Sequence, residues 1–197
     1  MSTFYLIRHA ANDFVGNTIV GWTPGISLNA EGRAQAERLA WKLLGKGITK
    51  LYSSPLERAL ETAGPIAEAL GLRVEVRDAL GEVKFGEWAG KRIEELERDP
   101  RWRMFNQYRS GTRAPGGELA AESQVRIVTE LEHLRGKHPG ETIGLVSHAD
   151  IIRAALVYYA GMPIDLGQRI EIRPASFSVL ALEDSGPRIL KLNETAD

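Results

Sequence analysis

Five side chains of types suited to phosphate chemistry are spread along the chain: Arg8, His9, Arg58, Glu82 and His148. A guanidinium can bind a phosphomonoester dianion through two parallel hydrogen bonds. An imidazole with one nitrogen bonded to a backbone carbonyl keeps the other nitrogen free as a nucleophile, and it needs no metal for this. A carboxyl group with a pKa near neutrality can protonate a leaving oxygen and then activate water. The set therefore favours phosphoryl transfer.

Each of these residues also has a purely structural interpretation. The Arg-His pair could form a salt bridge, and Arg58 lies beside Glu57 and Glu61, as on a solvated helical face. Glu82 could be an ordinary loop carboxylate, and His148 a helix cap. The combination favours a site, because four structural coincidences would have to fall at the ends of four separate strands.

The elements that must position these side chains follow from the apolar pattern. Apolar runs between turn residues predict strands, and amphipathic stretches ended by glycine or proline predict helices. The predicted strands span residues 3–8, 48–54, 72–77 and 142–147, and the predicted helices span 32–47, 55–70, 122–140 and 149–161. Strands alternating with helices imply βαβ units and a mainly parallel sheet, an α/β fold. Because ligands of such sheets bind beyond the carboxyl ends of the strands, we expect the five side chains to meet there.

Two parts of the chain depart from this alternation. Residues 83–118 combine a weak helical pattern with later turn residues, and they are too short for a core of their own. We interpret them as a lid or insertion after Glu82, so that residues 1–197 form one domain. Toward the C-terminus, three short stretches are expected to be strands that can add antiparallel pairing: 168–173, 177–182 and 188–192.

Composition excludes several classes of protein. The 25 basic and 26 acidic residues nearly cancel, which gives no reason to expect nucleic acid or an anionic membrane as partner. There is no cysteine, so disulfides, thiolate nucleophiles and cysteine-ligated zinc are excluded. No secretory signal or membrane-length apolar run is visible, from which we expect a cytoplasmic protein. No strand is followed by a P-loop or dinucleotide-binding glycine motif.

Four spaced motifs resemble those of the histidine phosphatase superfamily, which also contains the cofactor-dependent phosphoglycerate mutases. They are LIRHAAN at 6–12, SSPLERALETA at 53–63, LGEVKFGEWAG at 80–90 and LVSHADIIRAAL at 145–156. The stretch GWTPGISLNAEGRAQA at 21–36 also resembles the loop and helix after the first motif. In order, the resemblance covers residues 3 to 156, and it is the spacing of all four motifs that makes it specific.

The resemblance implies a three-layer α/β/α fold of the phosphoglycerate mutase type. It implies that His9 is the nucleophile that forms a phosphohistidine, and that Arg8, Arg58 and His148 hold the transferring phosphoryl group. Glu82 would protonate the leaving oxygen and then help to deprotonate water. The implied reaction needs no metal and no cofactor, and its partner is a small phosphomonoester.

Further candidates for substrate contact come from the loops and the lid. They are Asn12, Gly21, Trp22, Ala149, Arg109 and Arg113. Asn12 stands where the family often has serine or threonine, and its amide can still donate to a phosphate oxygen. Alanines at positions 10 and 149 replace glycines of the family, which matters only if the backbone there needs a positive φ.

Hydrolysis and mutase activity are the two main alternatives. The mutases tend to be longer after the glutamate, to carry an Arg-Arg pair there, and to have asparagine after the second His-Gly. Here the segment is compact and Ala149-Asp150 takes the place of that asparagine. A carboxylate at Asp150 would repel a multiply anionic substrate if it faced the pocket. We therefore predict a phosphatase, with a mutase as the alternative and a non-catalytic phosphate-binding relative as a third.

Substrate identity and assembly stay open at this point. Sugar phosphates, phosphoglycerate, phosphoserine, nucleotides and cofactor precursors are all compatible with the motifs, because a fold does not set the leaving group. The sequence leaves the oligomeric state open, and a homodimer is compatible with it.

Overall fold

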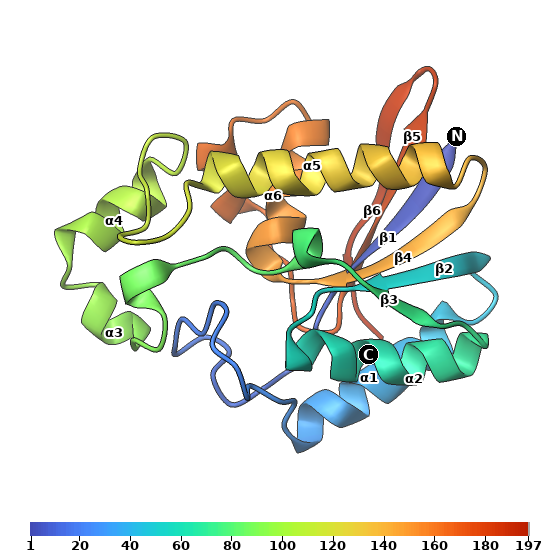
Figure 1. The fold of residues 1–197 in the computed structure, drawn as a ribbon, viewed down its shortest axis with the longest axis horizontal. Helices are drawn as coiled ribbons and strands as arrows, with labels where there is room; N and C mark the ends of the chain where they lie inside the picture. Colours follow the sequence, from blue (N-terminus) through green and yellow to red (C-terminus); the bar gives the residue numbers. More distant parts are fainter. Residues whose placement is uncertain (197) are drawn as a thin grey trace.

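The computed structural model describes residues 1–196 and is built on one six-stranded sheet. The strand order is β3-β2-β4-β1-β5-β6 (Figure 1). The strands are β1 (Ser2–Arg8), β2 (Ile48–Ser53), β3 (Val74–Val76), β4 (Thr142–Ser147), β5 (Phe177–Glu183) and β6 (Gly186–Glu194). The first four pair in parallel, whereas β5 runs antiparallel to β1 and β6 antiparallel to β5. The predicted mainly parallel α/β fold is confirmed.

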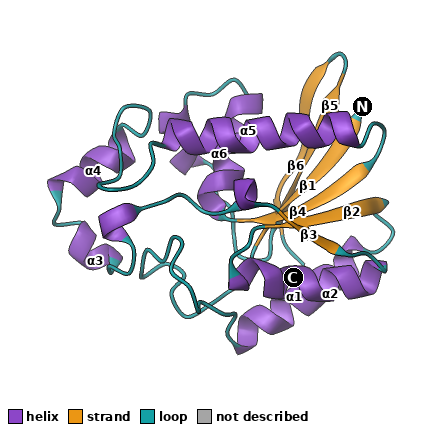
Figure 2. Ribbon diagram, viewed as in Figure 1, coloured by secondary structure: helices purple, strands orange, loops and turns teal. Residues whose placement is uncertain are grey.

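Helices cover both faces of the sheet and make three layers (Figure 2). One face packs on α1 (Ala30–Leu43) and α2 (Glu57–Leu70), the other on α5 (Ala120–Lys137) and α6 (Ala149–Tyr159). The alternation of β1 explains this, because Leu6 points into the core under α5 and α6 while Ile7 points into the core under α1 and α2. No helix within the described part of the chain is long and apolar enough to span a bilayer.

The segment predicted as a lid projects beyond the carboxyl ends of the parallel strands (green in Figure 1). It contains a short 3-10 helix, η2 (Gly86–Trp88), then α3 (Ile93–Leu96) and α4 (Pro100–Gln107). Its aromatic side chains pack edge to face, with ring centroids of Trp88 and Trp102 5.2 Å apart and of Trp88 and Phe105 also 5.2 Å apart. They belong to the same apolar cluster as the sheet residues under α5 and α6, so the segment is anchored in the main core.

The expectation of a strand at 168–173 is wrong. The short helix η3 (Ile164–Arg169) covers its start, and the rest is an extended loop that leads back to β5. Two of its backbone carbonyls accept from arginine side chains: Ile170 O from Arg153 Nε at 2.8 Å and Ile172 O from Arg8 Nη1 at 2.6 Å. The alternating segment therefore bonds two arginine side chains through its carbonyls instead of extending the sheet.

Candidate active site

A pocket of about 330 Å³ opens at the carboxyl ends of β1, β2 and β4. Its base is lined by Arg8, His9, Asn12, Arg58 and Glu82. The N-terminal ends of α2 and α6 lie at the same edge, so the positive ends of two helix dipoles lie near the pocket.

His9 stands at the end of β1 and is held there by backbone bonds on both sides. Its N–H donates to Ser147 O of β4 at 2.9 Å, and its carbonyl accepts from Ala175 N at 3.2 Å. The ring is 4% exposed, and Nδ1 bonds to Ala10 O at 2.8 Å. Burial, followed by the charges of Arg58 and Arg8, lowers the pKa of His9 well below its ordinary value. The imidazole is therefore neutral, with its proton on Nδ1 and Nε2 free.

Arg8 and Arg58 bring two guanidinium groups to the same base. Arg58 is 1% exposed, so the solvated-face interpretation is wrong. Arg58 Nη2 donates to Gly21 O at 2.8 Å, which is how the loop residue Gly21 meets the site. Three buried nitrogen atoms, Arg8 Nε and Arg58 Nε and Nη1, have no hydrogen-bond partner among residues 1–196. Burial lowers the pKa of both groups, that of Arg8 to about 10, yet both stay cationic at neutral pH.

His148 lies beside His9, with its ring centroid 5.1 Å from that of His9. Nε2 is 2.7 Å from Ser54 Oγ, a hydroxyl that already accepts from Leu56 N. With the Ser54 proton donated to Nε2, the ring proton lies on Nδ1. Nδ1 is buried and has no partner within the described chain, so it is a further available donor. Burial, then the charge of Arg58, lowers the pKa of His148.

Glu82 follows the short helix η1 (Asp78–Leu80) and lines the pocket beside the two arginines. Its Oε1 accepts from Val83 N at 2.9 Å. Burial, with a smaller contribution from the charge of Asp150, raises the pKa of Glu82 to about 7. This carboxyl can therefore give up or accept a proton near neutral pH, as an acid and base in turn must.

The pocket lining also includes a charged cluster around Asp150 in the first turn of α6. Its Oδ1 is 2.9 Å from Arg153 Nη1 and 3.3 Å from Arg109 Nη1. Burial by itself would raise the pKa of Asp150, but the two arginines outweigh it and hold that pKa below its ordinary value. Gln168 accepts from Arg109 when its amide oxygen faces the guanidinium. Apolar side chains also line the pocket: Phe14, Val15, Ile19, Phe85, Ile93 and Trp102.

The other substrate-contact candidates divide into two groups. Asn12 and Ala149 line the pocket, and Asn12 Nδ2 is a buried donor with no partner among residues 1–196. Trp22 lies outside the lining and donates from Nε1 to Glu82 O at 2.6 Å. Arg113 also lies outside and is paired with Glu122, with half of its side chain exposed.

The backbone resolves the question raised by the two alanines that replace family glycines. Among the described residues, the non-glycine positions with positive φ are Ala175 and Asn193. Ala10 and Ala149 therefore have ordinary backbone conformations, and a methyl group is accommodated without strain.

Sequence reasoning did not select several residues that meet the pocket. Asn106, Arg153 and Gln168 line it; Arg153 lies within the motif at 145–156 but was not singled out, and the other two lie outside all four motifs. Arg153 lies one helical turn after Ala149, so its spacing in α6 is a signal that was available. Gln168 carries no such signal, because it reaches the pocket from the end of η3.

Comparison with known proteins adds independent findings. The sequence profile of the histidine phosphatase superfamily (branch 1) matches residues 4–195. Phosphoserine phosphatase 1 of Hydrogenobacter thermophilus is 34% identical over 202 residues, which cover 99% of this chain and 93% of that protein. The probable phosphoglycerate mutase GpmB of Escherichia coli is 30% identical over 189 residues, which cover 94% and 87%. A mutant phosphoserine phosphatase from Entamoeba histolytica, solved with phosphoserine, superposes with a TM-score of 0.89 at 26% identity, covering 98% of both chains.

Proposed function

This chain belongs to branch 1 of the histidine phosphatase superfamily and is a phosphoric monoester hydrolase, and we propose that it works without a metal through a phosphohistidine at His9. The observation that carries this proposal is a neutral, buried imidazole surrounded by unpaired donors. Arg8, Arg58, Asn12 and His148 all hold such nitrogen atoms. Buried donors without acceptors are costly, and a phosphoryl group with three anionic oxygens supplies the acceptors they lack.

In the first step, Nε2 of His9 attacks phosphorus and the bond from phosphorus to the ester oxygen breaks. The leaving oxygen takes the proton of Glu82, whose pKa of about 7 leaves a protonated fraction at neutral pH. The guanidinium groups of Arg8 and Arg58 neutralise the phosphoryl oxygens as charge shifts toward the leaving group. The products are the free alcohol and a phosphohistidine.

In the second step, the Glu82 carboxylate takes a proton from water and the water oxygen attacks phosphorus. The bond from phosphorus to Nε2 breaks, inorganic phosphate leaves, and His9 returns to its neutral form. Glu82 is protonated again and ready for another ester, so one carboxyl serves as acid and then as base.

We also propose that the preferred substrate is the phosphate ester of a small amino acid, with O-phosphoserine as the best candidate. Among the described residues that line the pocket, Glu82 and Asp150 are the carboxylates, and Asp150 is paired with two arginines. A carboxylate on the substrate would meet Arg109 and Arg153, while an ammonium would meet Asp150. The names of the relatives from Hydrogenobacter and Entamoeba agree with such a substrate.

A mutase is the second candidate, since Arg109 and Arg153 could hold the carboxylate of phosphoglycerate, and the relative from Escherichia coli carries that name. Asp150 argues against it. This carboxylate offsets part of the positive charge of Arg109 and Arg153, which a second phosphate would need.

The test is phosphate release from a panel of phosphomonoesters by the pure protein in EDTA, run beside His9→Ala. A coupled assay follows conversion of 3-phosphoglycerate to 2-phosphoglycerate with the bisphosphate present. We expect EDTA-resistant hydrolysis that is fastest on O-phosphoserine and is lost in His9→Ala. Isomerisation that outruns phosphate release would instead make the protein a mutase, and hydrolysis that survives in His9→Ala would reject this nucleophile.

A further inference from the structure

The segment that carries Glu82 has little regular structure of its own. Between β3 and the lid it contains only the single turn of η1, so few bonds internal to the segment hold the carboxyl in place. A proton donor must lie within hydrogen-bond reach of one particular oxygen atom, and small displacements reduce the rate of transfer. Something outside the segment has to hold it.

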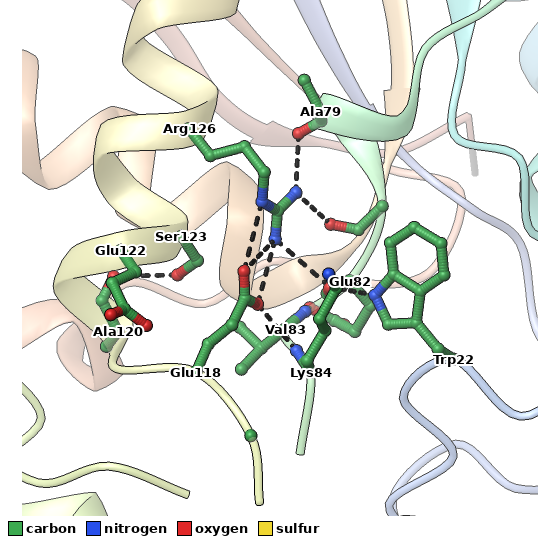
Figure 3. Close-up of polar contacts among 12 residues, drawn as sticks. Trp22, Ala79, Glu82, Val83, Lys84, Glu118, Ala120, Glu122, Ser123 and Arg126 are labelled. Atoms are coloured by element: carbon green, nitrogen blue, oxygen red, sulfur yellow. Dashed lines mark hydrogen bonds and ion pairs between the residues drawn. The ribbon is translucent and has the colours of Figure 1, made fainter. Parts of the chain in front are cut away.

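One guanidinium, that of Arg126, donates hydrogen bonds to backbone carbonyls of this segment (Figure 3). Arg126, in the second turn of α5, donates from Nη1 to Ala79 O and to Gly81 O, both at 2.8 Å. Its Nη2 donates to Glu82 O at 3.3 Å. Arg126 does not line the pocket, so it acts on the proton donor and not on the substrate.

Glu118 pairs with this guanidinium and also bonds to the backbone of Lys84, on the other side of Glu82. It accepts from Arg126 Nη2 at 3.1 Å and from Arg126 Nε at 3.3 Å. Its Oε2 also accepts from Lys84 N at 2.7 Å, and its backbone N–H donates to Lys84 O at 2.8 Å. Both side chains are largely buried, which strengthens a charge-assisted pair of this kind.

Trp22 also contacts the Glu82 segment. Its Nε1 donates to the same Glu82 carbonyl that Arg126 reaches, and its ring lies against Gly81. A methyl group on Gly81 would come within 2.2 Å of that ring, so only glycine permits the contact. The Glu82 backbone is thus held between a tryptophan and an arginine from distant parts of the chain.

We propose that Arg126, fixed by Glu118, is a positioning residue that aims the Glu82 carboxyl at the leaving oxygen. The inference rests on the proposed role of Glu82 as proton donor. It predicts that loss of Arg126 damages proton donation selectively, whereas a brace that only stabilises the fold would affect every substrate alike.

The experiment compares kcat/KM for two classes of ester, because kcat/KM reports on steps up to cleavage of the ester bond. An alkyl phosphate such as O-phosphoserine needs a proton on its leaving oxygen, while p-nitrophenyl phosphate releases an anion that is stable without one. For Arg126→Gln we expect a loss of roughly 30-fold on the alkyl ester, within the range of general acid catalysis. The loss on p-nitrophenyl phosphate should stay below about threefold, and Arg126→Lys should recover part of the alkyl activity.

Two controls separate this inference from the proposed function. Glu82→Gln calibrates the assay: equal losses on the two esters would reject Glu82 as proton donor, whatever Arg126 does. If Glu82→Gln is selective but Arg126→Gln lowers both esters equally, or neither, the positioning role is overturned. Arg135→Gln, on the same helix and paired with Asp184 at the surface, is the matched arginine control and should leave both rates unchanged.

Should Arg126→Gln fail to fold, Glu118→Gln decides the question. This variant keeps the carbonyl bonds of the guanidinium but weakens the ion pair that orients it, so we expect a smaller loss confined to the alkyl ester. Equal losses on the two esters, or none, would overturn the positioning role.

Discussion

The carboxylate of Asp150 lies 3.3 Å from the guanidinium of Arg109, which links the first turn of α6 to the end of the lid segment. Arg109 is 7% exposed, so this contact forms a wall of the pocket and not a surface pair. From the sequence alone, a carboxylate that faces the pocket here predicts repulsion of a multiply anionic substrate. The structure changes that expectation, because Arg109 and Arg153 neutralise it and leave a site with both signs of charge.

Asp150→Asn should change which substrate is preferred. O-phosphoserine and 3-phosphoglycerate differ by an ammonium in place of a hydroxyl, so they probe this carboxylate alone. We expect the ratio of their kcat/KM values to fall by roughly tenfold in favour of phosphoglycerate, as for loss of one hydrogen bond to a charged group. A change in the pKa of Glu82 would alter both rates together and cancel in the ratio. An unchanged ratio would show that Asp150 does not read the amino group.

Arg109→Gln should raise KM for substrates that carry a carboxylate. We expect an increase of roughly 10-fold with a smaller change in kcat, because the lost contact is made equally before and during the reaction. Arg113→Gln is the natural comparison, since that lid arginine is paired with Glu122 outside the pocket. Steady-state kinetics on O-phosphoserine should show the effect in the first variant only, and equal effects in both would argue against a direct contact.

A phosphorylated His9 should be trapped during turnover. Rapid quenching of a reaction with ³²P-labelled ester is expected to leave label on the protein that is lost in acid and retained in alkali, as for a phosphoramidate. His9→Ala should carry none, while Glu82→Gln should still accumulate label from p-nitrophenyl phosphate. Label that survives acid would point to a different nucleophile.

The activity on alkyl esters should decline on the alkaline side of neutrality. Glu82 must carry its proton to donate it, and its pKa of about 7 means that the protonated fraction falls above that pH. The profile of log(kcat/KM) should therefore bend downward near pH 7 for O-phosphoserine. Glu82→Gln should remove the bend, and p-nitrophenyl phosphate should not show it in the native protein. A bend common to both esters would instead report a different group.

The same pKa predicts a cost in stability. The folded-state pKa of Glu82 is raised from its ordinary value of 4.5 to about 7, mainly by burial. Below pH 4.5 both folded and unfolded chains keep the proton, so the group carries no penalty there. Between 4.5 and 7 the unfolded chain ionises first, which destabilises the fold increasingly, and above 7 the penalty is constant. Thermal unfolding should thus show Glu82→Gln gaining a few degrees at pH 8 and nothing at pH 4.5, and equal gains at both would contradict this.

The location of the catalytic candidates at one edge could be predicted from the sequence for a simple geometric reason. Arg8, His9 and His148 follow directly on apolar runs that had to be buried parallel strands, and the carboxyl ends of such strands share one edge. Arg58 needed one further step, a helix that starts just after its strand. Local spacing is enough to predict where such residues lie, because hydrogen bonding between parallel strands aligns their carboxyl ends.

The C-terminal region shows where periodicity misleads. Residues 168–173 alternate as a strand does, but Arg8 and Arg153 take two of their carbonyls. The alternating pattern indicates that one side of the chain is buried. It does not indicate which donors bond to the backbone carbonyls. A loop whose carbonyls accept from arginine side chains can show the same alternation of apolar and polar residues as an edge strand.

The types of the candidate site residues, their order and the strand ends where they meet could be predicted from the sequence. The contacts that surround these residues could be seen only in the folded structure. Asp150 is neutralised in part because Arg109 of the lid segment contacts it. The backbone carbonyl of Glu82 accepts from Trp22 and Arg126, which are 60 and 44 residues away along the chain. Contacts at such separations depend on how the elements pack against one another, and no local pattern of apolar and polar residues encodes that packing.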